Sequence, residues 1–298
     1  MDKKKFDSIV GKSLGPRRMD YTWRDVALYA LAVGAHTDDM PYIYEKADFK
    51  ALPTFGLLPY LNSILVQPQR RVPYAPNELI GDIIIEELGG KIPNRLHMGM
   101  ELVMHKTIAP MQGTFLTEDV VESIYDWGEK GIVGKTRMDV YDLAGNSVCT
   151  LRSTHFHGAF GGYGGEPYRS TKLQYPDRPP DYEVVDHIAE NQAILYRLLG
   201  DTYDVHIDPV VARGYGYKGP FMQGLCTYGF AARMGIQAII PYEPERVTRL
   251  DAQIRNICYP GQEVKFIGWK TKEGTVYFRL LNPEGKALLD NCVLEYYR

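Results

Sequence analysis

An acid and an imidazole stand five residues apart in the second half of the chain, at Asp201 and His206. They flank a turn just after a predicted helix end, and such a turn can aim both side chains into one cleft. The segment Gly219–Gly224 then leads into an apolar helix predicted over Leu225–Ile240. The first backbone N–H groups of that helix have no intrahelical partner and favour a developing negative charge. An acid, a base and an oxyanion donor are what addition of water across an enoyl thioester requires.

The elements that must position these groups form a degenerate internal repeat. Two segments of the first half recur in the second half, Ala27–Ala35 as Ala193–Asp201 and Leu52–Leu58 as Phe221–Thr227. Leu28 aligns with Leu195 and Gly56 with Gly224, so the offset is about 167 residues. The first segment of each pair is apolar and helix-like, and its next-to-last residue is a glycine, which favours the end of a helix there.

Strand-like sequence follows each pair. In the second half, Leu250, Ala252 and Ile254 alternate with polar residues, which is the period of a strand. Further runs begin at Val264, Val276 and Leu288, with a hairpin turn at Asn282–Gly285, and the first half reads similarly from Gly81 to Phe156 with a matching hairpin loop at Asp142–Asn146. The sequence therefore predicts an α+β fold of two helix-wrapped antiparallel-sheet repeats, a double hotdog, whose sheets pair into one.

Glycine and proline mark the boundary between the repeats. Gly161-Gly162-Tyr163-Gly164-Gly165 is followed by Pro176, Pro179 and Pro180, a composition typical of a linker. We predict an N-terminal repeat over residues 1–160, a linker over 161–180 and a C-terminal, catalytic repeat over 181–298.

Composition excludes several classes of function. The 298 residues carry a formal net charge of -3, which gives no case for nucleic acid as a partner. No stretch approaches the roughly 20 apolar residues that span a bilayer, and no secretory signal is seen, so no membrane association is expected. The four cysteines lie far apart without a CxxC pair, and reduced buried thiols fit a cytoplasmic protein.

Two separated motifs, in the right order, resemble the hydratase-2 family of MaoC-like enoyl-CoA hydratases. In the second half these are Tyr196-Arg197-Leu198 through Gly200-Asp201, His206-Ile207-Asp208-Pro209, and Gly224-Leu225-Cys226-Thr227-Tyr228-Gly229-Phe230-Ala231. In the first half, Tyr21–Val26, Phe49–Gly56 and the linker Phe160–Gly165 look like the N-terminal part of its two-hotdog members. The resemblance covers nearly the whole chain.

This resemblance implies a lyase that interconverts a trans-2-enoyl-CoA and a (3R)-3-hydroxyacyl-CoA. Asp201 and His206 would hold and activate one water, and the N–H of Gly224 would bind the thioester oxygen. It implies no metal or redox cofactor, because CoA arrives with the substrate. The first half lacks the acid and base, and Ala35 stands at the position of the acid. By the same resemblance, this half would open space for the acyl chain, and Phe55 and Gly56 would line that space. We expect a homodimer.

Several positions depart from the family pattern. Tyr203 replaces the family's Asn, Asp204 and Val205 replace Pro and Leu, and Leu199 replaces Ser. Gln223 stands where many members have His before the oxyanion glycine. A tyrosine is larger than asparagine and offers one hydroxyl in place of an amide. If Tyr203 points into the cleft, it shrinks the cavity or bonds the substrate, and if it points out, the acid has lost an orienting partner. We expect Tyr203 and Gln223 to contact an unusual acyl group; the alternatives are an unchanged reaction in a rearranged pocket and weakened catalysis.

Other interpretations stay open beside the hydratase. The chain could be another hotdog enzyme on thioesters, such as a thioesterase, or a non-catalytic acyl-CoA binder, since one fold hosts several chemistries. Cys226 is expected to be a buried packing residue because nothing nearby lowers a thiol pKa. His155 and His157 mimic a metal pair on one strand face, but without a third ligand we expect them in the core.

Overall fold

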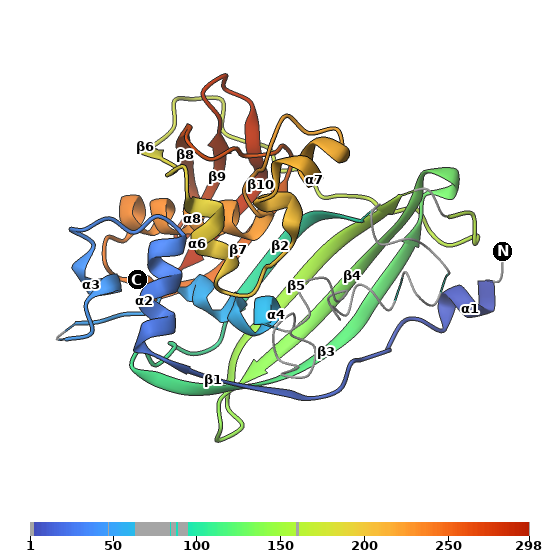
Figure 1. The fold of residues 1–298 in the computed structure, drawn as a ribbon, viewed down its shortest axis with the longest axis horizontal. Coiled ribbons are helices and arrows are strands. Elements are labelled where there is room, and N and C mark those ends of the chain that lie inside the picture. Colours follow the sequence, from blue (N-terminus) through green and yellow to red (C-terminus); the bar gives the residue numbers. More distant parts are fainter. Residues whose placement is uncertain are drawn as a thin grey trace.

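The computed structural model describes residues 3–46, 48–62, 95–158 and 161–297, together with Ile84 and Leu88. Its centre is one antiparallel sheet (Figure 1) with the strand order β1-β3-β4-β5-β2-β7-β10-β9-β8-β6. The strands are β1 (Arg17–Thr22), β2 (Arg95–Met104), β3 (Gln112–Asp126), β4 (Gly131–Tyr141), β5 (Ser147–Gly158), β6 (Tyr182–His187), β7 (Val247–Ile254), β8 (Glu263–Lys272), β9 (Thr275–Leu281) and β10 (Ala287–Tyr296). The α+β class predicted from sequence is confirmed.

The sheet consists of two copies of one topology. The first half contributes β1-β3-β4-β5-β2 and the second half β6-β8-β9-β10-β7, and the copies meet where β2 pairs with β7. Joining the repeats through these two strands leaves neither of them as an open edge, which is the reason for predicting a continuous sheet. That prediction is confirmed.

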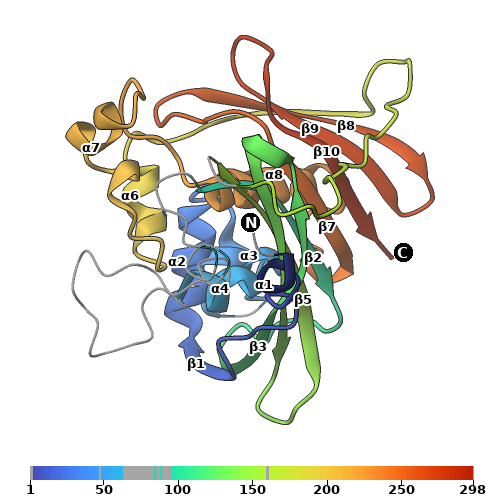
Figure 2. The ribbon, with the colours of Figure 1, turned by 90° about the vertical axis from the view of Figure 1, so that its right-hand side faces the viewer.

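The helices lie on one side of this sheet (Figure 2). The described α-helices are α1 (Lys3–Asp7), α2 (Trp23–Ala32), α3 (Met40–Ile43), α4 (Leu58–Asn62), α6 (Gln192–Arg197), α7 (Pro209–Gly214) and α8 (Gly224–Ile239). The described 3-10 turns are η1 (Pro53–Leu57), η4 (Gly128–Lys130), η5 (Asp204–His206) and η6 (Pro244–Arg246). Helices α2 and α6 are the repeated pair, and the predicted glycine stop after α2 is confirmed because Gly34 adopts φ +85°.

Helix α8 forms the centre of the core. Every residue from Leu225 to Ile236 is buried, because the sheet covers one side of the helix and α2 and α6 cover the other. The corresponding part of the first repeat, η1 and α4, is described only to Asn62. Of the predicted strand-like segment from Gly81 to β2, the structure describes only Ile84 and Leu88, and both are helical, so the prediction is wrong at these two residues. Phe160 of the linker motif lies outside the described residues.

The two hairpin turns predicted from sequence are confirmed and are built alike. Asp142 N–H bonds the carbonyl of Asn146 at 2.9 Å, and Asn282 N–H bonds that of Lys286 at 2.9 Å. Each turn is closed by the side chain of its first residue, which accepts the N–H of the last residue. Equivalent Asx turns at the same place in both halves support the internal repeat predicted from the sequence.

The segment between the repeats, residues 161–181, has neither helix nor strand and follows the sheet from one repeat to the other. Trp127 of the first repeat donates its indole N–H to the Tyr168 carbonyl, and the Tyr175 hydroxyl donates toward Asp290 of the second. The exact domain limits stay a prediction.

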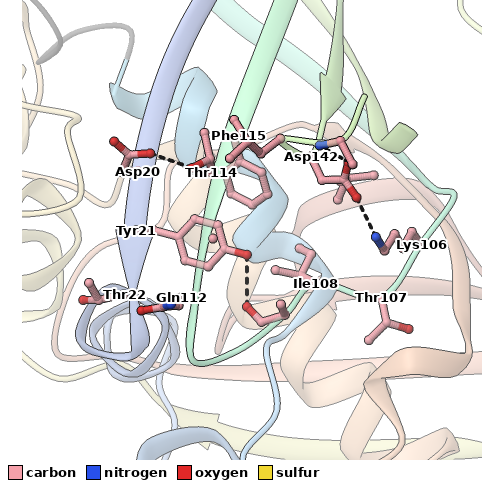
Figure 3. A pocket seen from close by; sticks show the side chains of 15 residues that line it. Asp20, Tyr21, Thr22, Lys106, Thr107, Ile108, Gln112, Thr114, Phe115 and Asp142 are labelled. Atoms are coloured by element: carbon pink, nitrogen blue, oxygen red, sulfur yellow. Dashed lines mark hydrogen bonds and ion pairs between the residues drawn. The ribbon is translucent and has the colours of Figure 1, made fainter. Parts of the chain in front are cut away.

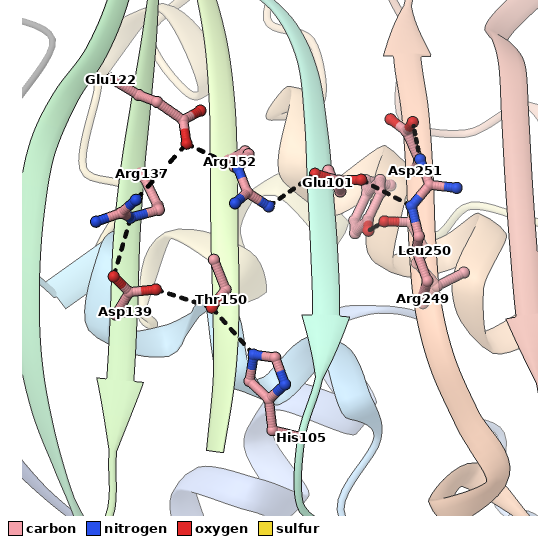
Figure 4. A network of polar contacts seen from close by, with 11 residues as sticks. Glu101, His105, Glu122, Arg137, Asp139, Thr150, Arg152, Arg249, Leu250 and Asp251 are labelled. Carbon is pink, nitrogen blue, oxygen red and sulfur yellow. Dashed lines mark hydrogen bonds and ion pairs between the residues drawn. The ribbon is translucent and has the colours of Figure 1, made fainter. Parts of the chain in front are cut away.

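Charged residues cover the face of the sheet opposite the helices (Figure 4). Arg152 bonds Glu122 at 3.0 Å and Glu101 at 3.2 Å, and Arg249 bonds Glu101 at 2.7 Å and Asp251 at 2.7 Å. Glu101 on β2 thus joins an arginine from each repeat, so this network crosses the β2–β7 junction.

Candidate active site

The predicted acid and base lie in the loop between α6 and α7. Asp201 follows Gly200 and is half-buried, and its Oδ1 lies 3.5 Å from the backbone N of Tyr203. The next turn, η5, ends at His206, which is also half-buried. Asp208 then caps α7 by accepting the N–H groups of two following residues. The cap and the short turn fix the loop that carries both side chains.

A backbone carbonyl fixes the imidazole of His206. Its Nδ1 lies 2.8 Å from the carbonyl oxygen of Phe221, and the two rings meet edge to face with centroids 5.0 Å apart. Because a carbonyl only accepts hydrogen bonds, Nδ1 carries the proton and donates it to Phe221. In the neutral ring, Nε2 is therefore left with a lone pair, the form that a general base requires.

Asp201 and His206 do not bond each other. Among the described residues, no hydrogen bond or ion pair joins their side chains. The carboxylate of Asp201 instead acts on buried neighbours: after burial itself, it is among the causes that raise the pKa values of Tyr196 and Cys226. Asp201 is thus placed at the border between the half-buried loop and the core.

The first turn of α8 supplies the backbone donors. Gly224 is the first residue of the helix, and the side chain of Gln223, the N-cap residue, makes no capping hydrogen bond to it. Gln223 is fully buried and donates its amide to the Ala193 carbonyl at 3.1 Å. A Cβ on Gly224 would lie 2.8 Å from Cδ1 of Ile254, so the backbone approaches β7 more closely than a side chain allows.

One short segment therefore serves both halves of the site. Phe221 orients the imidazole, and three residues later Gly224 begins the helix whose unpaired N–H groups can bind an oxyanion. Met222 between them is held by a 2.8 Å bond from its N–H to the Cys258 carbonyl. Tyr203 is half-buried. The substrate-binding roles predicted for Gly224, Gln223 and Tyr203 stay predictions.

The equivalent loop of the first repeat has Ala35 at the position of Asp201. Its His36 bonds Asp186 of β6 at 3.1 Å, and Asp186 also pairs with the buried Arg233 of α8. Arg233 in turn donates to the Val33 carbonyl at 2.9 Å. This loop thus fastens the first repeat to the second, and the sequence alone did not predict that contact.

Phe55 and Gly56, predicted to line the acyl pocket, lie in the core between the repeats. Phe55 is 0% exposed and packs against Tyr21, Tyr29 and Phe115. A Cβ on Gly56 would lie 2.9 Å from the Cys149 sulfur. Contact of either residue with substrate stays a prediction.

The cysteines and histidines singled out earlier are buried as expected. Cys226 is fully buried, burial raises the pKa of its thiol, and its Sγ lies 3.3 Å from the Ala32 carbonyl. His155 and His157 are buried on the inner face of β5. Within the ranges that the structure covers, no three His, Cys, Asp or Glu side chains are arranged to hold a metal ion. Among the described helices, none is long and apolar enough to cross a membrane.

A separate pocket of about 600 Å³ lies in the first repeat (Figure 3). It lies between β1, β3, the β2–β3 loop and the β4–β5 hairpin; the Tyr21 hydroxyl bonds the Ala109 carbonyl there, and Lys106 pairs with Asp142. None of the predicted site residues lines it.

Comparison with known proteins gives matches along the whole chain. The MFE-2 hydratase 2 N-terminal domain family matches residues 19–158, and the MaoC-like domain family matches residues 172–284. A probable enoyl-CoA hydratase 2 of Dictyostelium discoideum is 29% identical, over 96% of this chain and 94% of its own. The mouse peroxisomal multifunctional enzyme type 2 is 31% identical over 97% of this chain, which spans only 38% of that longer protein.

Solved structures agree. A MaoC-like dehydratase from Phytophthora capsici superposes with a TM-score of 0.84 at 28% identity, over 98% of this chain and 99% of its own. A Mycobacterium tuberculosis protein described as a double hotdog superposes with a TM-score of 0.60 at 12% identity and 98% coverage of both chains, which shows the fold alone. With both repeats matched in order, the chain belongs to the hydratase-2 family of MaoC-like, double-hotdog proteins.

Proposed function

We propose that this protein is a hydro-lyase that adds water across the 2,3 double bond of a trans-2-enoyl-CoA to give a (3R)-3-hydroxyacyl-CoA, or removes it in reverse. The names of its relatives, enoyl-CoA hydratase 2 and 3-hydroxyacyl-thioester dehydratase, support this reaction. The water oxygen bonds C3, one water proton goes to C2, and the π bond is consumed, so the atoms balance without a redox step.

The observation that carries the mechanism is the bond between His206 and the Phe221 carbonyl. It leaves Nε2 of the neutral imidazole able to accept a proton from water. Asp201 would hold the same water as a second acceptor. As the water oxygen attacks C3, negative charge moves to the thioester oxygen, where the N–H of Gly224 would stabilise it. No step needs a metal or a redox cofactor, and CoA enters as part of the substrate.

Two competing functions make different predictions. A thioesterase would release free CoA thiol, and a non-catalytic binder would hold CoA esters without turnover. The geometry favours hydration because the imidazole and the helix start share one segment. A thioesterase can use a carboxylate alone and does not need this pairing.

We propose further that the protein is a homodimer that acts in the cytoplasm. Symmetric dimers are the default oligomer, and the four buried free cysteines fit a reducing compartment. Several relatives are named as peroxisomal, so fractionation of cells is the test of compartment. A monomer mass by light scattering would contradict the dimer.

The testing experiment follows the ultraviolet absorbance of the conjugated enoyl thioester over time, using short, branched, aromatic and long enoyl-CoAs. We expect absorbance to fall, a (3R)-hydroxyacyl product by chiral analysis, and no free thiol. Free thiol would identify a thioesterase. Binding of every CoA ester without loss of absorbance would identify a binder.

A further inference from the structure

Behind the catalytic loop, two tyrosines from the two repeats meet in the core. Tyr29 of α2 and Tyr196 of α6 occupy equivalent positions, at the same offset of about 167 residues that relates the repeats. Their ring centroids lie 6.4 Å apart and both side chains are 0% exposed. Tyr196 precedes Asp201 by five residues in the same helix-and-loop segment.

The hydroxyls of both tyrosines lack hydrogen-bond partners among the described residues, and so do Oγ1 of Thr54 and Oε1 of Gln223. All four side chains are fully buried. A buried polar group without a partner costs stability, and native proteins usually satisfy such groups with ordered water. The Tyr29, Thr54 and Tyr196 hydroxyls, which lie in the core between the repeats, therefore point to bound water.

Further contacts place these groups together. The Tyr29 hydroxyl lies 3.1 Å from where a Cβ on Gly229 would stand, so the missing side chain on α8 makes room for it. Burial raises the pKa of Tyr29 well above its usual range, and the Thr54 hydroxyl lies near enough to the Tyr29 hydroxyl to lower that pKa, although the two do not meet the geometry of a full hydrogen bond. Burial also raises the pKa of Tyr196, and the next causes are Tyr29, Cys226 and Asp201. The polar groups thus form a series from Thr54 in the first repeat to Asp201 in the second.

We propose that Tyr29, Thr54 and Tyr196 bind ordered water between the repeats, and that through this water Tyr196 is a positioning residue for Asp201. The Tyr196 hydroxyl donates to the water, and the water donates to the Asp201 carboxylate, which is then held toward the half-buried loop. The ligand is water alone. The part concerning Asp201 rests on the proposed hydratase function, whereas the bound water does not.

The test compares Tyr196→Phe with Tyr42→Phe. Tyr42 of α3 is 1% exposed and its hydroxyl also lacks a partner among the described residues, but it contacts Tyr242 and not the catalytic loop. Tyr196→Phe should lower kcat for hydration about 10-fold to 100-fold, since small misplacements of a catalytic group have effects of that size. KM and melting temperature should stay near the wild-type values, and Tyr42→Phe should leave kcat unchanged.

Removal of a hydroxyl that is merely unsatisfied gives a different result. Tyr196→Phe would then raise the melting temperature and leave kcat unchanged, which would overturn the proposal, as would an equal loss of kcat in Tyr42→Phe. If Tyr196→Phe does not fold, Tyr29→Phe replaces it and should lower kcat in the same direction.

A high-resolution crystal structure provides a readout independent of activity. Density for water within hydrogen-bond distance of the Tyr196 hydroxyl is expected, and its absence contradicts the proposal. A wild-type protein that hydrates no enoyl-CoA would instead refute the proposed function while leaving the water site to be judged from the density.

Discussion

The Nδ1 atom of His206 donates its proton to the carbonyl oxygen of Phe221 across 2.8 Å, so the orientation of the proposed base depends on the backbone just before α8. The same backbone begins the helix at Gly224. A displacement of this segment would therefore misplace the base and the oxyanion donor together.

His206→Gln should lower kcat for hydration by about 100-fold to 10,000-fold, because glutamine cannot accept and return the proton. Steady-state kinetics with the best enoyl-CoA of the panel measures it. His187→Gln is the matched control: His187 lies exposed at the end of β6 and should keep the wild-type rate. Equal losses in both variants would argue against a specific role for His206.

Gly224→Ala should lower both stability and kcat, because its Cβ would meet Ile254 at 2.8 Å and displace the N–H that binds the oxyanion. We expect about 1–3 kcal/mol of destabilisation from the overpacking. Gly235→Ala, further along the same helix, meets the Phe266 ring at 3.0 Å and should lose stability while keeping kcat. Adding Ile254→Val, which removes the clashing methyl group, should restore activity to Gly224→Ala; failure of this rescue would mean that the clash is not the cause.

Tyr203→Asn restores the residue that the family motif has at this position and should widen the range of acyl groups accepted. Asparagine is smaller, so bulkier enoyl-CoAs should gain about tenfold in kcat/KM relative to short ones, the scale of discrimination by pocket size. Competition between pairs of substrates measures this ratio. Tyr215→Asn, at an exposed residue that follows α7, is the control. An unchanged ranking in Tyr203→Asn would place the tyrosine outside the acyl pocket.

Ionisation of the Asp251 carboxyl should lower the free energy of unfolding as the pH rises. Burial raises its pKa from 3.8 to about 6, with the Glu101 carboxylate acting in the same direction and Arg249 opposing. The folded state thus binds this proton more tightly than the unfolded state, so the stability it contributes is fully present below pH 3.8 and is lost as the pH rises through about 6. Asp251→Asn cannot ionise and should become more stable relative to the wild type across that window.

Urea unfolding at several pH values on both sides of the window tests this sign. Asp290→Asn serves as the contrast: although burial opposes it, the Arg279 guanidinium and further hydrogen bonds hold the pKa of Asp290 below its usual value. That variant should lose stability relative to the wild type as the pH rises. The same pH dependence in both variants would contradict the assignment to Asp251.

The repeat, the second-half strands, the hairpins and α8 could be predicted because their signals are local. Leu250 and Ala252 alternate with polar neighbours, and both are 0% exposed on β7. The edge strands β1 and β6 were missed because each is only six residues long and pairs far along the chain, β1 with β3 and β6 with β8. Their pairing is set by tertiary contacts, which local patterns do not reveal.

The same distinction between local sequence signals and tertiary contacts applies to the candidate site. The spacing of Asp201 and His206, together with the family resemblance, predicts the acid and the base, and those two roles stay predictions. The bond to Phe221 could not be foreseen, because it depends on where a backbone carbonyl points. The meeting of Tyr29 with Tyr196, likewise, results from packing between the repeats.

The most direct test of the account measures the hydration rate of Asp201→Asn beside Asp208→Asn. Both changes replace a carboxylate by an amide in one loop, and asparagine can keep the cap that Asp208 provides for α7. The account predicts that Asp201→Asn loses about 100-fold to 10,000-fold in kcat while folded, and that Asp208→Asn stays near the wild-type rate. A folded Asp201→Asn that hydrates enoyl-CoA at the wild-type rate would contradict the central claim.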